Sequence, residues 1–226
     1  MLHTLARGLL DLLAPPVCPG CELAWDALEG PAFCPACAPL IEPPPVGLCA
    51  PAPFAAAVTY QGPVADAIRR FKYARASHLA APLSTLLVPS ARCYSGCVDA
   101  VVPMPLHPSK LRERGFNPSA LLARPAARAL GVPLRAAWLT RRRATSSQAG
   151  LTSEARQRNV LGAFVPHHQT EPCRILLIDD VCTTGATLAA ASHALQNCGH
   201  RVTTLALAWA PFDRAGPSSS TAPGTV

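Results

Sequence analysis

Several features that are common in proteins are scarce or missing in this 226-residue sequence. No apolar run approaches the ~20 residues that a membrane-spanning helix needs, so we expect no membrane span. The chain has two lysines, Lys72 and Lys110, and neither follows a glycine. This argues strongly against a P-loop ATPase, whose G-x-x-x-x-G-K-[ST] motif needs a Gly-Lys pair. Aromatic residues make up 5% of the chain, which leaves no evident platform for stacking single-stranded nucleic acid.

The overall composition is that of a globular protein. Half of the residues are apolar and 15% are charged, which fits a domain with a buried core and a small appendage. The 25 prolines predict many fixed turns. The apolar segment 2–13 is interrupted by Arg7 and Asp11, and no small-residue cleavage site follows it. We interpret it as an amphipathic helix rather than a signal peptide, and we expect a cytoplasmic protein.

The net charge of +7 is unevenly distributed. From Lys110 to Arg158 there are eleven basic residues, against the two acidic residues Glu113 and Glu154. Such a local excess favours a polyanionic ligand, either a pyrophosphate group or nucleic acid. The alternative is an ordinary solvated basic face in a protein that uses arginine in place of lysine.

The most specific motif runs from Ile175 to Thr187. Four apolar residues predict a buried strand, and Asp179 and Asp180 stand where that strand should end. A helix is expected to begin after them, and a helix N-terminus offers unpaired N–H groups and a partial positive charge to phosphate. The two carboxylates suit vicinal hydroxyls or a metal on the same ligand. Together these groups describe a site for a ribose 5-phosphate; an acidic surface turn without a ligand is the alternative. The phosphate-binding turn would consist of Thr183, Thr184, Gly185, Ala186 and Thr187.

Four of the ten cysteines form two C-x2-C pairs that are separated by twelve residues, namely Cys18, Cys21, Cys34 and Cys37. Two such pairs can complete a tetrahedral four-cysteine site, so we predict a structural zinc ion. A pair of disulfides is the alternative, which a reducing compartment disfavours. Cys182 lies inside the predicted phosphate turn, where a helix N-terminus should lower the pKa of its thiol. A filler role for Cys182 is the simpler explanation.

The remaining pattern alternates strands and helices. Strands are predicted at 54–60, 98–102, 160–165, 174–178 and 202–208, with helices at 64–73, 116–130 and 184–198. Pro125 should kink or divide the second helix. This order predicts an α/β fold with a parallel sheet flanked by helices. We expect a zinc module over residues 1–50, the α/β domain over 54–212 and a disordered tail over 213–226.

The phosphate turn resembles the phosphoribosyl-pyrophosphate loop of type I phosphoribosyltransferases, and the chain as a whole resembles the ComF family. The pieces that match follow in order: an N-terminal helix, the cysteine pairs, Tyr60-Gln-Gly62, Phe71-Lys72-Tyr73, Val102-Pro-Met-Pro105, Arg114-Gly-Phe-Asn117, Gln148-Ala-Gly-Leu151, Arg156-x-x-Asn159 and the Asp-Asp-x-x-Thr-Thr-Gly loop. Pro118 stands where relatives commonly have Gln, and residues 74–78 lack a common Gly-Asp.

The resemblance implies a type I phosphoribosyltransferase-like fold that binds phosphoribosyl pyrophosphate together with Mg2+. Asp179 and Asp180 would hold the ribose hydroxyls. A turn at 104–110 would hold pyrophosphate, with added charge from Lys110, Arg112 and Arg114. Residues 141–159 would form the flexible loop that closes over the ligand, with Arg141, Arg142, Arg143 and Gln148 as candidates; ordinary surface charge is the alternative for these basic residues.

The family is linked to DNA uptake in natural competence, which implies competence proteins as partners. Two functions follow from the resemblance. The first is an enzyme that transfers a phosphoribosyl group with loss of pyrophosphate, to an acceptor that no motif here identifies. The second is a non-catalytic module that senses phosphoribosyl pyrophosphate or binds single-stranded DNA through its backbone.

Overall fold

The computed structural model describes residues 17–25, 31–143, 162–167 and 171–211. Three sequence predictions therefore lie outside the described residues: the N-terminal helix at 2–13, the loop from residue 144 to 159 with Gln148, and the tail at 213–226. Within the described part of the chain, no helix is long and apolar enough to cross a membrane.

The described residues form a four-stranded parallel sheet with the order β1-β6-β5-β2. The strands are β1 (Phe54–Thr59), β2 (Ala100–Pro103), β5 (Arg174–Cys182) and β6 (Arg201–Trp209). The central pair is in register from Arg174 opposite Arg201 to Cys182 opposite Trp209. Helices cover both faces, as they do for parallel sheets generally. The predicted α/β class with a parallel sheet is confirmed.

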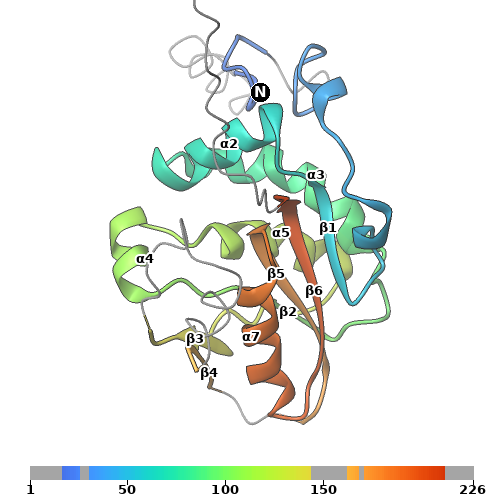
Figure 1. Cartoon of the computed structure of the whole chain (residues 1–226), viewed down its shortest axis with the longest axis vertical. Coiled ribbons are helices and arrows are strands. Elements are labelled where there is room, and N and C mark those ends of the chain that lie inside the picture. Colours follow the sequence, from blue (N-terminus) through green and yellow to red (C-terminus); the bar gives the residue numbers. More distant parts are fainter. Residues whose placement is uncertain (1–16, 26–30, 144–161, 168–170, 212–226) are drawn as a thin grey trace, which may run out of the picture.

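Alternate residues of β5 enter two separate cores. Leu176 and Ile178 pack with α3 (Ala80–Arg92) and α5 (Pro118–Leu130), whereas Ile175 and Leu177 pack with α7 (Ala186–Gln196). Figure 1 shows α7 on one side of the sheet, and α3 and α5 on the other. This arrangement explains the unbroken apolar run of the strand, because a side chain that points to either face is buried.

Shorter elements complete the described structure. They are α2 (Gly62–Tyr73), α4 (Pro108–Arg114), the antiparallel pair β3 (Leu139–Arg141) and β4 (Phe164–Pro166), and the 3-10 turns Ala38–Leu40, Val46–Leu48 and Ser77–Leu79. Ile68 and Phe71 of α2 are fully buried, as its amphipathic pattern predicts.

Four details differ from the sequence predictions. β5 continues to Cys182, so the two aspartates lie within the strand instead of after it. The strand predicted at 160–165 is the shorter β4, which pairs with β3 outside the main sheet. Pro125 lies inside α5 without dividing it. The sequence analysis also missed α3, whose prolines obscure the helical spacing of Leu83, Leu87 and Ala91.

Candidate functional site

A cavity of about 790 Å³ opens at the carboxyl end of β5. This is the edge at which parallel α/β sheets generally bind ligands. The cavity joins five parts of the chain: the end of α2, the segment after β2, the start of α5 with Ser119, the end of β3, and the end of β5 with the turn into α7. Its lining includes most of the residues that the sequence proposed for the site: Lys110, Arg114, Arg141, Asp179, Asp180, Thr183, Thr184, Gly185, Ala186 and Thr187.

The two aspartates are held by residues from distant helices. Lys72 Nζ on α2 lies 2.8 Å from Asp180 Oδ1, and both side chains are largely buried. Ser119 Oγ on α5 donates to Asp179 Oδ1 at 3.0 Å, and the backbone N–H of Asp180 donates to the same oxygen at 2.8 Å. Neighbouring carboxylates in a buried place repel each other, so these donors stabilise the pair.

The positive charge of Lys72 does not fully offset the two buried carboxylates. Burial, followed by the charge of Asp180, raises the pKa of Asp179 to about 7. Burial also disfavours the ammonium form of Lys72, but the carboxylates of Asp180 and Asp179 outweigh that effect and raise the pKa of Lys72. A carboxyl group that titrates near neutrality inside a cavity is typical of a functional site.

The turn after β5 leads directly into α7. Gly185 is the N-cap residue of α7 and has a φ of 76°, in the left-handed region that favours glycine. A Cβ atom at this position would meet Cys182 Sγ only at 4.0 Å, so the backbone conformation is the reason for glycine. Thr184 Oγ1 accepts a hydrogen bond from Ala186 N at 3.4 Å. The first residues of α7, Ala186 to Leu188, line the same cavity as the two aspartates.

Cys182 differs from the sequence prediction. The thiol is 3% exposed, and burial, followed by the charge of Asp179, raises its pKa to about 12. The expected lowering by a helix N-terminus was wrong, because desolvation and the neighbouring carboxylate act more strongly here. Cys182 is therefore a protonated thiol in the wall of the cavity, which agrees with a filler role.

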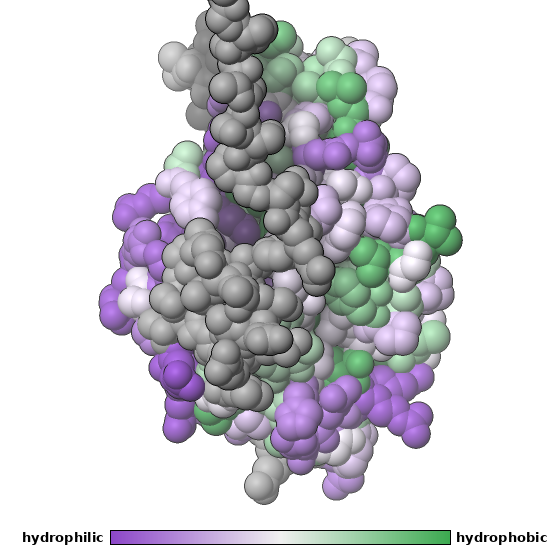
Figure 2. All heavy atoms as spheres, viewed as in Figure 1, coloured by the Kyte–Doolittle hydropathy of each residue, from purple (hydrophilic) through white to green (hydrophobic). Residues whose placement is uncertain are grey.

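The segment after β2 contributes positive charge to the wall of the cavity. The cavity is lined here by Pro105, Leu106, His107, Ser109 and Lys110. Helix α4 begins at Pro108, so Ser109 and Lys110 belong to its first turn. Lys110 pairs with Glu113 at 2.8 Å, and the Arg114 guanidinium lies 5.4 Å from the centre of the Tyr73 ring. Arg112 is exposed on α4 and does not line the cavity. Hydrophilic residues dominate the left edge of the molecule, where α4 lies (Figures 1 and 2).

Residues of the Arg114-Gly-Phe-Asn117 motif connect this segment to the helices around it. Gly115 ends α4 with a φ of 84°. Phe116 packs on Phe71 with ring centroids 5.4 Å apart. Asn117 donates from Nδ2 to Met104 O at 2.9 Å and caps α5 by accepting from Ser119 N at 3.1 Å. The motif thus fixes the backbone of the predicted pyrophosphate turn and positions Ser119.

Of the predicted flexible loop 141–159, the structure describes the first three residues, Arg141, Arg142 and Arg143. Arg141 ends β3 and lines the cavity, with its guanidinium 5.6 Å from the centre of the Phe164 ring. Burial lowers its pKa. Arg142 and Arg143 do not line the cavity.

Sequence reasoning missed Ser119 as a site residue and gave Lys72 no role at the acidic pair. No sequence signal links either of them to the aspartates. Ser119 is 3% exposed, and a buried hydroxyl needs a partner, but the sequence does not say which one.

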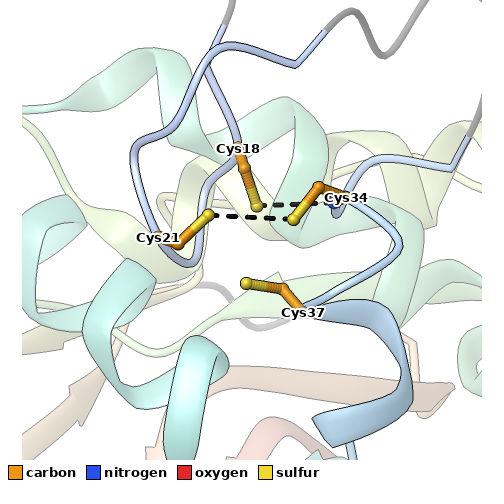
Figure 3. Close-up of side chains that lie close together, drawn as sticks. All are labelled: Cys18, Cys21, Cys34 and Cys37. Carbon is orange, nitrogen blue, oxygen red and sulfur yellow. Dashed lines mark hydrogen bonds between the residues drawn. The ribbon is translucent and has the colours of Figure 1, made fainter.

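A second cluster lies at the N-terminal end of the described chain. The Sγ atoms of Cys18, Cys21, Cys34 and Cys37 all lie within 4.8 Å of one another, and their side chains converge (Figure 3). The Sγ atoms of Cys21 and Cys34 are 3.7 Å apart. A tetrahedral zinc ion with Zn–S bonds of about 2.3 Å requires sulfurs about 3.8 Å apart. All ten cysteines lie in described residues and none forms a disulfide, so the disulfide alternative is not realised.

The backbone around the cluster favours a thiolate at Cys18. Burial alone would raise its pKa, but backbone hydrogen bonds from Cys34, Cys21 and Gly20 lower it to about 6. The N–H groups of Gly20 and Cys34 each lie 3.4 Å from Cys18 Sγ. Thiolates are the form that binds zinc. The four-cysteine cluster is compatible with a structural zinc ion that leaves no open coordination position. Cys49, Cys93 and Cys97 are exposed and lie outside it.

Comparison with known proteins finds relatives over most of the chain. The DNA utilization protein YhgH of Salmonella typhimurium is 34% identical over 179 residues, which are 74% of this chain and 79% of that protein. The protein of the same name from Escherichia coli K12 is 35% identical over 165 residues, or 69% of this chain and 73% of its own length. Competence protein F of Haemophilus influenzae is 30% identical over 148 residues, or 62% and 65%. No family model matches the chain.

Among solved structures, purine phosphoribosyltransferase from Pyrococcus horikoshii is 18% identical, covers 62% of this chain and 78% of its own, and gives a TM-score of 0.35. Adenine phosphoribosyltransferase from Trypanosoma brucei, in complex with AMP, pyrophosphate and ribose-5-phosphate, is 15% identical, covers 69% and 76%, and gives a TM-score of 0.38.

Proposed function

This chain belongs to the ComF family, and from that premise we propose that it binds phosphoribosyl pyrophosphate with Mg2+ in a role linked to DNA uptake. The observation that carries the proposal is the cavity itself. Its lining combines the acidic pair Asp179 and Asp180, the turn 183–187 that follows them, and the basic residues Lys110, Arg114 and Arg141. A ligand with one diol and two phosphate ends matches this distribution of charge.

Each part of the ligand has a proposed partner. The 5′-phosphate sits in the turn 183–187, where the first N–H groups of α7 and the threonine hydroxyls donate to its oxygens. Asp179 and Asp180 accept hydrogen bonds from the ribose 2′ and 3′ hydroxyls. Lys110 and Arg114, which line the cavity, attract the pyrophosphate, and Arg141 is the lining residue with which the proposed 141–159 closing loop begins.

A bound Mg2+ ion would neutralise part of the pyrophosphate charge. Oxygen ligands suit this ion, and the carboxylates of Asp179 and Asp180 are the matching donors of this cavity. Since the pKa of Asp179 is about 7 without a ligand, a nearby cation and two hydroxyl donors would favour its ionised form.

The proposed reaction is phosphoribosyl transfer with loss of pyrophosphate, and it uses no protein nucleophile. Cys182, the thiol in the cavity wall, is protonated and is not suited to attack. The residues contribute by fixing the ligand and by stabilising the charge of the departing pyrophosphate. Closure of a loop would exclude water from the ribosyl cation that forms.

The direct test is isothermal titration of the full chain with phosphoribosyl pyrophosphate and Mg2+, followed by measurement of pyrophosphate release with a panel of acceptors. We expect saturable binding at one site per chain and release that depends on one acceptor. Binding without release for any acceptor would contradict transfer and favour a sensing role. Absence of binding would contradict the site.

A second function has specific support. The relatives are named for DNA utilization and competence, and α4 carries three basic residues, of which Lys110 and Arg112 are exposed and Arg114 is half-buried. We propose that α4 contacts the phosphate backbone of single-stranded DNA. Binding should then weaken steeply with added salt. An affinity that does not change with salt would contradict backbone contact through α4.

We also propose that the four-cysteine cluster holds a structural zinc ion. The short segment has little core of its own, so the ion would supply much of its folding free energy. Chelation should make residues 17–41 sensitive to protease, while protection that persists after zinc removal would contradict this proposal.

A further inference from the structure

Helix α2 contacts both the four-cysteine cluster and the acidic pair of the cavity. Arg70 donates from Nη2 to the carbonyl oxygens of Gly20, at 2.9 Å, and Pro19, and its Nη1 lies 2.7 Å from Glu22 Oε1. These three residues belong to the first cysteine pair and its immediate neighbour. Lys72 lies two positions further along α2 and contacts Asp180 at 2.8 Å.

The two side chains leave the helix on nearly opposite sides. Successive residues of an α-helix are rotated by about 100°, so positions 70 and 72 differ by about 200°. Phe71 between them is fully buried and packs on Phe116. The end of α2 is therefore held on three sides, by the cysteine module, by the core and by the acidic pair.

The module also packs closely against the start of α2. A Cβ atom at Gly20 would lie 2.5 Å from Pro63 Cβ and 2.9 Å from Cys37 Sγ, so only glycine fits there without a shift. Cys18, Cys34 and Cys37 share one hydrophobic cluster with Val64, Ala67, Ile68 and Phe71. A change in the cysteine module therefore reaches the helix through packing as well as through Arg70.

We propose that Lys72 is a positioning residue for Asp180, and that Arg70 ties its position to the four-cysteine cluster, so that zinc and ligand binding are coupled. This inference rests on the proposed function for the identity of the ligand. Lys72 holds one carboxylate of the acidic pair in place and offsets its charge against the phosphates of the ligand. When the cysteine module is folded around zinc, Arg70 and the contact of Gly20 with Pro63 hold α2 at the distance that this pair needs.

Coupling between two sites is reciprocal. If zinc improves ligand affinity through α2, the bound ligand must raise the affinity of the cysteine cluster for zinc by the same factor. The effect should be modest, because mutations between coupled sites typically change the coupling by about 2- to 30-fold.

The test compares zinc-loaded full-length variants. Titration with phosphoribosyl pyrophosphate and Mg2+ gives affinity, and transfer of zinc to a coloured chelator gives the rate of zinc loss. We expect Arg70→Ala to weaken ligand affinity by about 3- to 10-fold and to speed zinc loss. Lys72→Met should weaken affinity by more than about tenfold, without speeding zinc loss in the ligand-free protein. Arg69→Ala is the matched control, because Arg69 is exposed and forms an ion pair with Asp66 on the same helix; it should leave both readouts within about twofold.

Lys72→Arg separates charge from position. It keeps the positive charge, and partial recovery of affinity relative to Lys72→Met is expected. If Arg70→Ala disturbs folding, as circular dichroism would reveal, Glu22→Gln replaces it, since this change removes only the 2.7 Å ion pair with Arg70. Unchanged affinity in Arg70→Ala or Glu22→Gln with faster zinc loss would overturn the coupling. Unchanged or tighter affinity in Lys72→Met would overturn its positioning role.

Hydrogen exchange distinguishes failure of this inference from failure of the proposed function. Zinc removal, or Arg70→Ala with zinc present, should raise exchange in peptides covering 62–73 and 174–182, and no ligand is needed for this measurement. If the wild-type chain binds no phosphoribosyl pyrophosphate but exchange still spreads to 174–182, the proposed ligand is wrong and the link through α2 stands. If exchange rises only within 17–41, the link is wrong whatever the ligand.

Discussion

Strand β5 carries charged residues near both ends. At the amino end an arginine pairs with one aspartate, whereas near the carboxyl end two neighbouring aspartates have a single lysine beside them. At the amino end, Arg174 makes a two-pronged contact with the Asp99 carboxylate, with Nη2–Oδ1 at 2.6 Å and Nε–Oδ2 at 3.0 Å. Hydrogen bonds from Arg174 lower the pKa of Asp99 to about 2. At the carboxyl end, two aspartates share Lys72, and burial raises the pKa of Asp179 to about 7.

The difference separates a structural ion pair from the candidate binding site on the same strand. Opposite charges at the exposed amino end satisfy each other and need no further partner. Like charges at the carboxyl end are held together by Ser119, Lys72 and backbone N–H groups at a cost in stability. Such local conflict is expected where a protein keeps groups ready for a ligand.

Removing the acidic pair should have the largest effect. Asp179→Asn/Asp180→Asn should weaken binding of phosphoribosyl pyrophosphate with Mg2+ by at least about 100-fold, because hydrogen bonds to charged groups contribute about 1.5–3 kcal/mol each. Isothermal titration measures the loss, and Asp99→Asn at the opposite end is the control. Normal binding by the double variant would rule out this ligand site.

Cysteines near the two ends should differ in their reaction with iodoacetamide. Cys182 at the carboxyl end is buried with a pKa of about 12, whereas Cys97 near Arg174 is exposed. The thiolate is the form that reacts, so at pH 8 we expect labelling of Cys182 to be more than about tenfold slower. Peptide mass spectrometry gives both rates, with labelling in urea as the reference. Equal rates in the folded protein would show that Cys182 is accessible.

The stability contributed by the two ends should depend on pH with opposite sign. The pKa of Asp99 is lowered from near 4, so its contribution is present above pH 4 and is lost as pH falls toward 2. The pKa of Asp179 is raised, so its contribution is present below pH 4 and is lost as pH rises toward 7.

Thermal unfolding from pH 3 to pH 8 tests both signs. Asp179→Asn should raise Tm relative to wild type by several degrees at pH 8 and by less at pH 4. Asp99→Asn should lower Tm at pH 6 and lose its effect toward pH 2. If Asp179→Asn lowers Tm more at pH 8 than at pH 4, the ionised carboxylate stabilises the fold and the proposed conflict is absent.

Loss of the structural pair should have the smallest effect. Arg174→Ala should lower Tm by roughly 2 °C or less, because exposed ion pairs contribute little, and ligand affinity should stay the same. Calorimetry and the same titration provide the two measurements. A marked loss of affinity would show that the two ends of β5 are not independent.

Sequence reasoning succeeded where the relevant contacts are local. The two C-x2-C pairs predicted a cluster that forms, and the alternation of apolar segments predicted the parallel sheet. The sequence predictions were wrong where strand pairing set the length of a strand or core packing set the pKa of a side chain. β5 reaches Cys182 because Val181 and Cys182 pair with Ala208 and Trp209 of β6. Cys182 has a raised pKa because the surrounding core and Asp179 outweigh the helix end.

In the candidate site, too, the parts that the sequence predicted are those that lie close together along the chain. Asp179, Asp180 and the turn 183–187 follow one another in the chain, so their proximity is determined by the backbone and can be predicted from the order of residues alone. Gly185 belongs to this group, since its positive φ is a local requirement.

Tertiary structure alone decided which groups balance the acidic pair. Ser119 on α5 and Lys72 on α2 come from distant parts of the sequence, and only packing of both helices against one face of the sheet brings them to β5. The same packing places Arg70 against the cysteine module. The sequence determined what chemistry the turn after β5 offers. The fold determined the charge balance of the acidic pair and its link to the four-cysteine cluster, because those depend on contacts that local spacing does not encode.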